Sequence, residues 1–264
     1  MTVVDQVGRS VSIPTQPRRI VSLVPSITEL LVDLHLEDEL IGITKFCVQP
    51  YRLKSTKTIV GGTKNVREAK VAALQPDFII ANKEENTEEI VRNMGQIGPV
   101  FVSDIATLDD NLNLIRQFGT IFNRRTHADR LISKIEYEAS LFDDYILQQP
   151  HLKAAYFIWK KPYMVAGSNT FINHMMQRCR LNNIFATRGR YPEIEIKKLR
   201  LEGDPEVILL SSEPYPFKDE DAFEIGRFTH HAKVVFVDGE MFSWYGSRPA
   251  KAFQYFRKLR EQLA

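Results

Sequence analysis

The sequence predicts an α/β protein made of two similar lobes with mainly parallel sheets, joined by one long α-helix. Three observations support this: short apolar strands alternate with helical patterns, the order of elements repeats in the two halves, and an uninterrupted helical pattern lies between the halves. The predicted division is 1–122 for the N-terminal lobe, 123–149 for the linking helix and 150–264 for the C-terminal lobe.

The first lobe is predicted to contain four strands, Ile20–Val24, Ile41–Thr44, Phe78–Ala81 and Val100–Val102. A helix starts directly after the first strand, at Pro25-Ser26. Ser26 can be an N-cap, with Glu29 three residues later completing a capping box. It can also contact a ligand, because strand-to-helix turns in open α/β sheets present unpaired N–H groups. Taken alone, the capping interpretation is the stronger one.

The linking helix is predicted over 124–150. Its first proline or glycine is Pro150. Its apolar residues recur with helical spacing and are Leu131, Ile132, Ile135, Ala139, Phe142 and Ile146. At a rise of 1.5 Å per residue such a helix is roughly 35 Å long. It indicates a stiff connection between the lobes, although a helix packed on one lobe alone has the same periodicity.

The second lobe is predicted to contain strands at Ala154–Trp159, Val207–Leu210 and Val234–Val237. Its element order matches that of the first lobe. The helix, Pro-Asp turn and strand of 70–81 correspond to the helix, Pro-Glu turn and strand of 197–211. The segment 26–42 corresponds to 168–185, and both of these segments begin with Ser-x-Thr.

Composition is that of an ordinary globular chain, with 264 residues, 44% hydrophobic and 26% charged. A formal net charge of +2 gives no overall basic field, so no nucleic-acid partner is predicted. Cys47 and Cys179 are too few for a disulfide framework, and both thiols are expected to be reduced and buried. Residues 1–6 lack the features of a signal peptide, so we expect either a cytoplasmic protein or a mature form whose leader was removed.

The sequence also lacks the common catalytic signatures. It contains no Gly-x-Ser-x-Gly elbow, no Walker loop and no dinucleotide fingerprint. His230-His231 does not have the i, i+4 spacing of helix-borne metal ligands, and the other histidines are scattered. We therefore predict no catalytic residue, no metal held directly by side chains and no enzymatic activity.

The ordered set of segments resembles a known family. "RRIVSLVPSITELLVDLHLEDELIGITKFCVQP", "VGGTKN", "ALQPDFIIA", "NNIF", "PEVILLS" and "FVDGE" are similar to segments of the substrate-binding proteins of ABC importers for cobalamin and iron–siderophore complexes. The match runs from about Arg18 to the C-terminus. The resemblance implies two Rossmann-like lobes, one backbone helix and a corrinoid or ferric chelate held in the cleft between the lobes. It also implies no intrinsic cofactor, a monomer, a periplasmic or cell-envelope location and an ABC permease as partner.

Within the family, "IGITKFCVQP" is most similar to the cobalamin-binding branch, through Phe46, Cys47 and Pro50. A tryptophan that some corrinoid binders have beside the Gly-rich turn is absent here, where the chain reads Gly61-Gly62-Thr63-Lys64. The family docks on its permease through one acidic residue per lobe. These positions fall at Ala69, beside Glu68, and at Lys197, beside Glu195, so Glu68 and Glu195 are the docking candidates.

A chelate-sized ligand needs large amphipathic surfaces and a few charge partners, which aromatic and basic residues at strand ends supply. The first-lobe candidates are Pro25, Ser26, Phe46, Cys47, Gly62, Thr63 and Lys64, with the polar loop 82–86. The second-lobe candidates are Trp159, Tyr163, Arg190, Tyr191, Glu213, Trp244, Tyr245 and Arg248, with Lys160 and Tyr215 beside them.

These candidates have alternative roles. Phe46 and Trp159 abut predicted strands and are assigned to a core somewhat more readily than to a cleft. Cys47 is a small buried thiol in most settings. Trp244, Tyr245 and Arg248 suit a core and a ligand site equally well. Lys160 and Lys161 have the pattern of a solvated pair.

The leading hypothesis is a binding protein that captures a corrinoid or ferric siderophore for ABC-type import, with little lobe closure because the linker is a rod. The alternative is an intracellular enzyme or chaperone that handles corrinoids or metals on the same fold.

Overall fold

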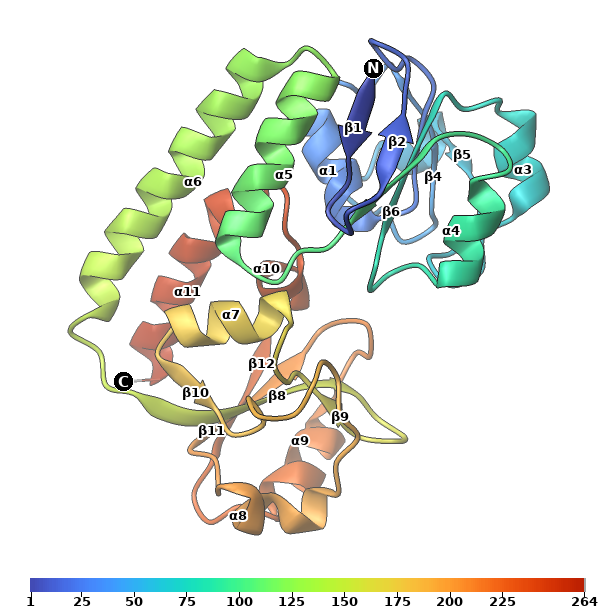
Figure 1. Cartoon of the computed structure of the whole chain (residues 1–264). Helices are drawn as coiled ribbons and strands as arrows, with labels where there is room; N and C mark the ends of the chain where they lie inside the picture. Colours follow the sequence, from blue (N-terminus) through green and yellow to red (C-terminus); the bar gives the residue numbers. More distant parts are fainter. Residues whose placement is uncertain (264) are drawn as a thin grey trace. The chain divides into compact units, whose positions relative to one another are not determined.

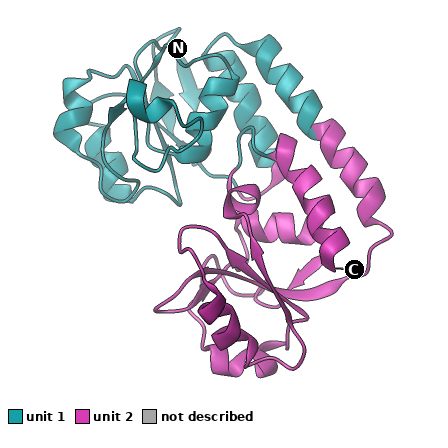
Figure 2. Cartoon of the chain, turned by 180° about the vertical axis from the view of Figure 1, so that it is seen from behind, with its two compact units in different colours: residues 1–105, 109–135, 245–248 teal, residues 106–108, 136–244, 249–264 magenta. Residues whose placement is uncertain are grey.

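A computed structural model describes residues 1–263. The chain forms two compact units, shown in different colours in Figure 2. Unit 1 comprises 1–105, 109–135 and 245–248, and unit 2 comprises 106–108, 136–244 and 249–264. The units divide inside the linking helix, and unit 1 includes a segment from near the C-terminus. The predicted segment boundaries at 122 and 149 stay a prediction.

Unit 1 contains a five-stranded parallel sheet with the order β5-β4-β3-β6-β7. Its strands are β3 (Ile20–Ser22), β4 (Leu40–Ile43), β5 (Thr58–Ile59), β6 (Phe78–Asn82) and β7 (Val100–Ser103). The four predicted strands are confirmed to within two residues at each end. β5 was not predicted, because two residues cannot display an alternating pattern.

Helices cover both faces of this sheet (Figure 1). They are α1 (Pro25–Asp33), α2 (Leu53–Thr56), α3 (Glu68–Ala73), α4 (Glu88–Met94) and α5 (Leu108–Ile121). Val71 of α3 and Met94 of α4 share one buried cluster with Ile79 of β6. The ring of Phe118 in α5 packs edge-on against Phe101 of β7, with centroids 5.4 Å apart. The sheet is therefore the middle of three layers.

The start of α1 differs from the capping interpretation. The N-cap is Val24, and Pro25 occupies the first turn. Proline suits this position, since its missing N–H would lack a helical partner there and its φ is already helical. Ser26 is buried inside the first turn, so the predicted Ser26 capping box is wrong.

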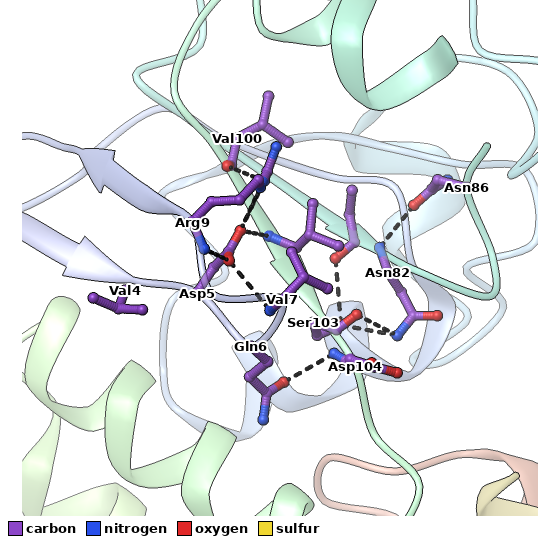
Figure 3. A network of polar contacts seen from close by, with 12 residues as sticks. Val4, Asp5, Gln6, Val7, Arg9, Asn82, Asn86, Val100, Ser103 and Asp104 are labelled. Carbon is purple, nitrogen blue, oxygen red and sulfur yellow. Dashed lines mark hydrogen bonds and ion pairs between the residues drawn. The ribbon is translucent and has the colours of Figure 1, made fainter. Parts of the chain in front are cut away.

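A hairpin of β1 (Thr2–Val4) and β2 (Ser10–Ser12) covers the outer edge of β7. Asp5 is the centre of its turn (Figure 3), where one carboxylate oxygen accepts hydrogen bonds from the Val7 and Arg9 N–H groups. The other accepts from the Arg9 guanidinium and from the Val102 N–H of β7. Arg9 also donates to the Val100 carbonyl at 2.9 Å. These contacts pair an otherwise open sheet edge.

Replacing Asp5 with alanine is expected to lower the free energy of unfolding by about 2 to 3 kcal/mol, because the buried Val102 N–H and the donors of Val7 and Arg9 lose their shared charged acceptor together. Urea unfolding measures the change. Asp33→Ala is the control, since Asp33 is exposed at the last position of α1. Equal midpoints for the two variants would contradict the role of the hairpin.

The predicted linking helix is confirmed as α6 (Arg125–Ile146), which is 22 residues long. Residues 125–135 belong to unit 1 and 136–146 to unit 2. None of the helices within 1–263 combines the length and apolar character needed to cross a lipid bilayer.

Unit 2 has a parallel sheet with the order β10-β8-β11-β12, and β9 pairs antiparallel with β8. Its strands are β8 (Leu152–Trp159), β9 (Met164–Val165), β10 (Leu181–Asn183), β11 (Val207–Ser211) and β12 (Lys233–Val237). The three predicted strands are confirmed. β9 and β10 were missed, because β9 has only two residues and two of the three residues of β10 are asparagines, so neither forms an apolar run.

The helices of unit 2 also form two outer layers. They are α7 (Phe171–Arg178), the 3₁₀ turn η1 (Ile196–Lys198), α8 (Leu199–Glu202), α9 (Asp219–Gly226), α10 (Gly239–Ser243) and α11 (Pro249–Leu263). Leu199 and Ile225 pack with Phe157 on one face. On the other face, Tyr156 packs against Phe242, with ring centroids 5.1 Å apart. The two-lobe α/β prediction with parallel sheets is confirmed.

Candidate functional site

The five strands of the main sheet of unit 1 are all parallel, so their carboxyl ends lie along one edge of that sheet. We call the loops at this edge the unit 1 edge. They carry every first-lobe candidate, namely Pro25, Ser26, Phe46, Cys47, Gly62, Thr63 and Lys64, and the loop 82–86. Such edges are where open α/β sheets bind ligands.

Phe46 provides the exposed aromatic surface of this edge. It follows β4 and is 49% exposed, so its assignment to a core is wrong. The Lys45 ammonium lies 4.9 Å from the centroid of its ring. A Cβ atom on Gly62 would lie 3.2 Å from the same ring, which means that the Gly-rich turn passes close beneath it. Phe46 is thus held in place while part of its ring stays open to solvent.

Buried amide and hydroxyl groups form a hydrogen-bonded network at the same sheet edge (Figure 3). The Asn82 side chain donates to the carbonyl and hydroxyl oxygens of Ser103, both at 3.0 Å. Asn86 accepts from the Asn82 N–H and donates to the Thr63 carbonyl at 2.9 Å. Lys64 donates to the Glu84 carbonyl. The loops after β5, β6 and β7 are therefore tied together as one polar layer.

Cys47 belongs to the interior of unit 1. Its Sγ lies 3.1 Å from the Thr28 hydroxyl and 3.3 Å from the Thr44 hydroxyl, and the residue has no exposed surface. Burial raises the pKa of the Cys47 thiol, and burial likewise raises that of Cys179. The expectation of reduced, buried thiols is confirmed. In this conformation Cys47 supports the edge from below and presents no atom to a ligand.

Both thiols are expected to resist an aromatic disulfide reagent at pH 8, because attack requires an accessible thiolate. Titration should count no reactive thiol in the native chain and two in guanidinium chloride. A native count of one or two would contradict the burial described for Cys47 and Cys179.

Glu85 is a half-buried carboxyl at the unit 1 edge. Burial raises its pKa, while Lys64 and a hydrogen bond from Thr63 act in the opposite direction. A carboxyl of this kind can be protonated at a higher pH than an exposed glutamate, and then donates a hydrogen bond as well as accepting one.

The segment 245–248 covers the joint between β3 and α1. Gly246 exchanges two hydrogen bonds with the Asn111 side chain, through its N–H and its carbonyl. Its φ is +78°, and a Cβ atom there would lie 3.0 Å from the Ser26 carbonyl oxygen. The Arg248 Nε donates to Glu29 Oε2 at 3.0 Å, and both side chains are buried. Tyr245 is buried too, and hydrogen bonds from Ser103 and Ser26 partly offset the effect of burial, which raises its pKa.

Tyr245 and Arg248 were predicted as second-lobe residues, whereas they are part of unit 1. Both side chains were expected to suit either a core or a ligand site, and both are buried as a core position requires. The sequence gives no sign that Tyr245 and Arg248 belong to unit 1, because their neighbour Trp244 belongs to unit 2 and the chain passes into unit 1 directly after it.

The carboxyl ends of β8, β11 and β12 form the unit 2 edge, which carries Trp159, Tyr163, Glu213 and Trp244. Trp159 is 39% exposed, so its assignment to a core is wrong. It packs edge-on against Tyr215, with ring centroids 5.8 Å apart. These two rings give unit 2 an aromatic surface comparable to Phe46 in unit 1.

Glu213 and Trp244 join neighbouring loops of the unit 2 edge. Glu213 Oε1 accepts from the Trp244 indole N–H and from the Ser243 hydroxyl, both at 2.9 Å. Trp244 is only 6% exposed, so the buried interpretation is correct for it. Its role is to hold Glu213.

Arg190 and Tyr191 lie after β10, in a loop whose backbone pairs with 167–168. The Arg190 N–H donates to the Ser168 carbonyl at 2.8 Å, and its own carbonyl accepts from the Gly167 N–H. Both side chains are half-buried. Their assignment to the ligand site stays a prediction.

Comparison with known proteins gives the family. Residues 20–227 match the family model described as periplasmic binding protein, which is well over half of the chain. The chain belongs to the periplasmic binding protein family. The family consists of solute-binding proteins, and those of ABC transporters bind small ligands and work with a permease.

Individual relatives of this periplasmic binding protein are distant. A vitamin B12-binding protein of Vibrio parahaemolyticus is 23% identical over 205 residues, which cover 76% of this chain and 74% of that protein. An uncharacterized ABC transporter substrate-binding lipoprotein of Bacillus subtilis is 24% identical over 94% of this chain and 81% of its own length. The crystal structure of the periplasmic vitamin B12-binding protein of Vibrio cholerae matches with a TM-score of 0.79 at 17% identity, covering 95% and 99% of the two chains. This last likeness shows the shared fold.

The docking candidates lie at helix starts, as the family resemblance implies. Glu68 is the first residue of α3 and accepts a hydrogen bond from the Asn93 amide at 2.7 Å. Glu195 precedes η1 and pairs with Lys198 at 2.6 Å. Both are exposed. Docking through them stays a prediction.

Sequence reasoning missed the residues that hold the edges together. Asn111 and Ser103 are buried polar residues that fasten 245–248 and Asn82. The sequence gives a weak indication for Ser103, because this residue ends β7 and the neighbouring strand β6 leads into the predicted polar loop 82–86. For metals, residues 1–263 bring together no group of three His, Cys, Asp or Glu side chains that suits an ion.

Proposed function

We propose that this chain is the solute-binding component of an ABC importer, located in the cell envelope, without enzymatic activity, and that its ligand is a metal chelate. A corrinoid fits better than a ferric siderophore. The observation that carries the proposal is the placement of half-exposed aromatic rings, Phe46 in unit 1 and Trp159 in unit 2, at the carboxyl edges of parallel sheets. Rigid aromatic surfaces of this kind bind large amphipathic ligands at low entropic cost.

Polar groups beside the rings support the choice of a corrinoid. Lys64 and Glu85 lie with buried amides and hydroxyls at the unit 1 edge, and Glu213 lies at the unit 2 edge. Carboxyl and hydroxyl groups match the many amide groups on the rim of a corrin. The vitamin B12-binding relatives agree with this choice, and the comparisons give no support to the intracellular alternative.

A thermal-shift screen tests the proposal with cyanocobalamin, cobinamide, haem and several ferric siderophores. A ligand present at a hundred times its Kd adds about 2.7 kcal/mol to the free energy of unfolding. We expect a rise in Tm of a few degrees with the corrinoids, confirmed by calorimetric titration. A shift with siderophores alone would change the ligand class, and no shift with any compound would overturn the proposal.

A further inference from the structure

Lys160 follows Trp159 directly and is fastened to α9 by two carboxylates. Its Nζ lies 2.5 Å from Asp221 Oδ1 and 2.8 Å from Glu224 Oε2. The prediction of a solvated Lys160–Lys161 pair is therefore wrong for Lys160, while Lys161 is exposed. Hydrogen bonds to Asp221 and Glu224 raise the pKa of Lys160, and the bond from Lys160 lowers that of Glu224. The group is charged at neutral pH.

Tyr163 completes this group from the other end of the same loop. Its hydroxyl donates to Glu224 Oε2 at 2.9 Å, and the Lys160 ammonium lies 5.8 Å from the centroid of its ring. Burial, followed by the contact with Glu224, raises the pKa of Tyr163 to about 12. Glu224 therefore anchors both ends of the loop 160–163.

Aromatic rings connect the same loop to the core of unit 2. Trp159 packs on Tyr215, and Tyr215 packs on Phe217 with ring centroids 4.8 Å apart. Phe157 contacts both Phe217 and Tyr163 edge-on, at 6.4 and 6.0 Å. The exposed Trp159 ring is thus the outer end of a packed series, and the charged group lies next to it along the chain.

We propose that Lys160 is a positioning residue, which fixes the half-exposed Trp159 ring so that it can stack on the conjugated macrocycle of a chelate ligand. The ligand-binding part of this inference rests on the proposed function. A ring that is already fixed loses little side-chain entropy when a ligand binds, so affinity depends on how firmly the ring is held. Lys161 has the same side chain one residue later, outside the ion-paired group, and serves as the matched comparison.

The first test needs no ligand. The chain has two tryptophans, and Trp244 is buried, so acrylamide quenching of fluorescence reports mainly on Trp159. We expect the quenching constant to rise about twofold in Lys160→Met and to stay unchanged in Lys161→Met. Glu224→Gln keeps an acceptor for Tyr163 and the Lys160–Asp221 contact, and should give a smaller rise. If Lys160→Met does not fold, the quenching constant of Glu224→Gln decides whether the ion-paired group fixes the Trp159 ring.

The second test measures the Kd of cyanocobalamin by calorimetry. We expect about a tenfold increase in Kd for Lys160→Met and less than a twofold change for Lys161→Met. Quenching that is equal in wild type, Lys160→Met and Glu224→Gln would overturn the positioning role, whatever the ligand. Increased quenching in Lys160→Met with an unchanged Kd would show that fixing the Trp159 ring does not matter for ligand binding, and would overturn that part of the proposal. A wild-type chain that binds no chelate would overturn the proposed function, and quenching would still decide whether Lys160 fixes the ring.

Discussion

Replacing Arg248 with methionine is expected to lower the free energy of unfolding by about 3 to 5 kcal/mol, because the buried Glu29 carboxylate loses its guanidinium donor. The Arg248 and Glu29 side chains are 7% and 8% exposed, and their contact is 3.0 Å long. Urea unfolding followed by circular dichroism measures the loss. Hydrogen exchange should locate it in α1, which carries Glu29.

Arg257→Met is the matched control for Arg248→Met. Arg257 pairs with Glu261 at 3.2 Å on an exposed face of α11, where an ion pair contributes about 1 kcal/mol or less. In the double variant Glu29→Met/Arg248→Met, part of the lost stability should return, since the buried carboxylate is removed together with the guanidinium that it accepted from. If Arg248→Met were as stable as Arg257→Met, the buried pair would not hold 245–248 in unit 1.

Replacing Phe46 with alanine is expected to weaken cyanocobalamin binding about 10- to 100-fold. The ring is the main apolar surface at the unit 1 edge, and losing an aromatic contact of about 1.5 to 3 kcal/mol corresponds to this change in Kd. Calorimetric titration measures it. The melting temperature should change little, because nearly half of the side chain is already exposed.

Tyr51→Ala separates this effect from a general loss of surface aromatics. Tyr51 is 78% exposed in the same connection after β4, and Lys54 lies 5.9 Å from its ring centroid, much as Lys45 lies by Phe46. Tyr51 lies eight residues past the end of β4, whereas Phe46 lies three residues past it. Removal of the Tyr51 ring should therefore change the Kd by less than twofold. Equal effects of the two substitutions would argue against a specific role for Phe46.

Most of the fold could be predicted from the sequence because its central strands are strongly apolar. The runs that became β6 and β8 stand between turn residues, and α6 has a helical period without a break. β5, with two residues, and β10, with the sequence Leu-Asn-Asn, leave no such pattern. The β1–β2 hairpin was also missed, since its stability depends on Asp5 reaching the distant Val102 N–H.

The candidate site was predicted less completely than the fold. Phe46 and Trp159 lie at the two sheet edges and are exposed there, because parallel strands collect their carboxyl ends at one edge, but their role in ligand binding stays a prediction. The burial of Arg248 depends on Glu29, 219 residues away in sequence, and no local pattern reports such a pairing. Lys160 and Lys161 look equivalent in the sequence, and only the position of α9 distinguishes them.

The position of 245–248 in unit 1 has a consequence for protein synthesis. Domains generally fold in order as the chain leaves the ribosome, N-terminal part first. Here Glu29 and Asn111 are made early, whereas their partners Arg248 and Gly246 follow 219 and 135 residues later. Unit 1 therefore cannot complete its folding until residues 245–248 have emerged, after most of unit 2 has been made. A nascent chain stalled before residue 245 should remain sensitive to proteases in its N-terminal half.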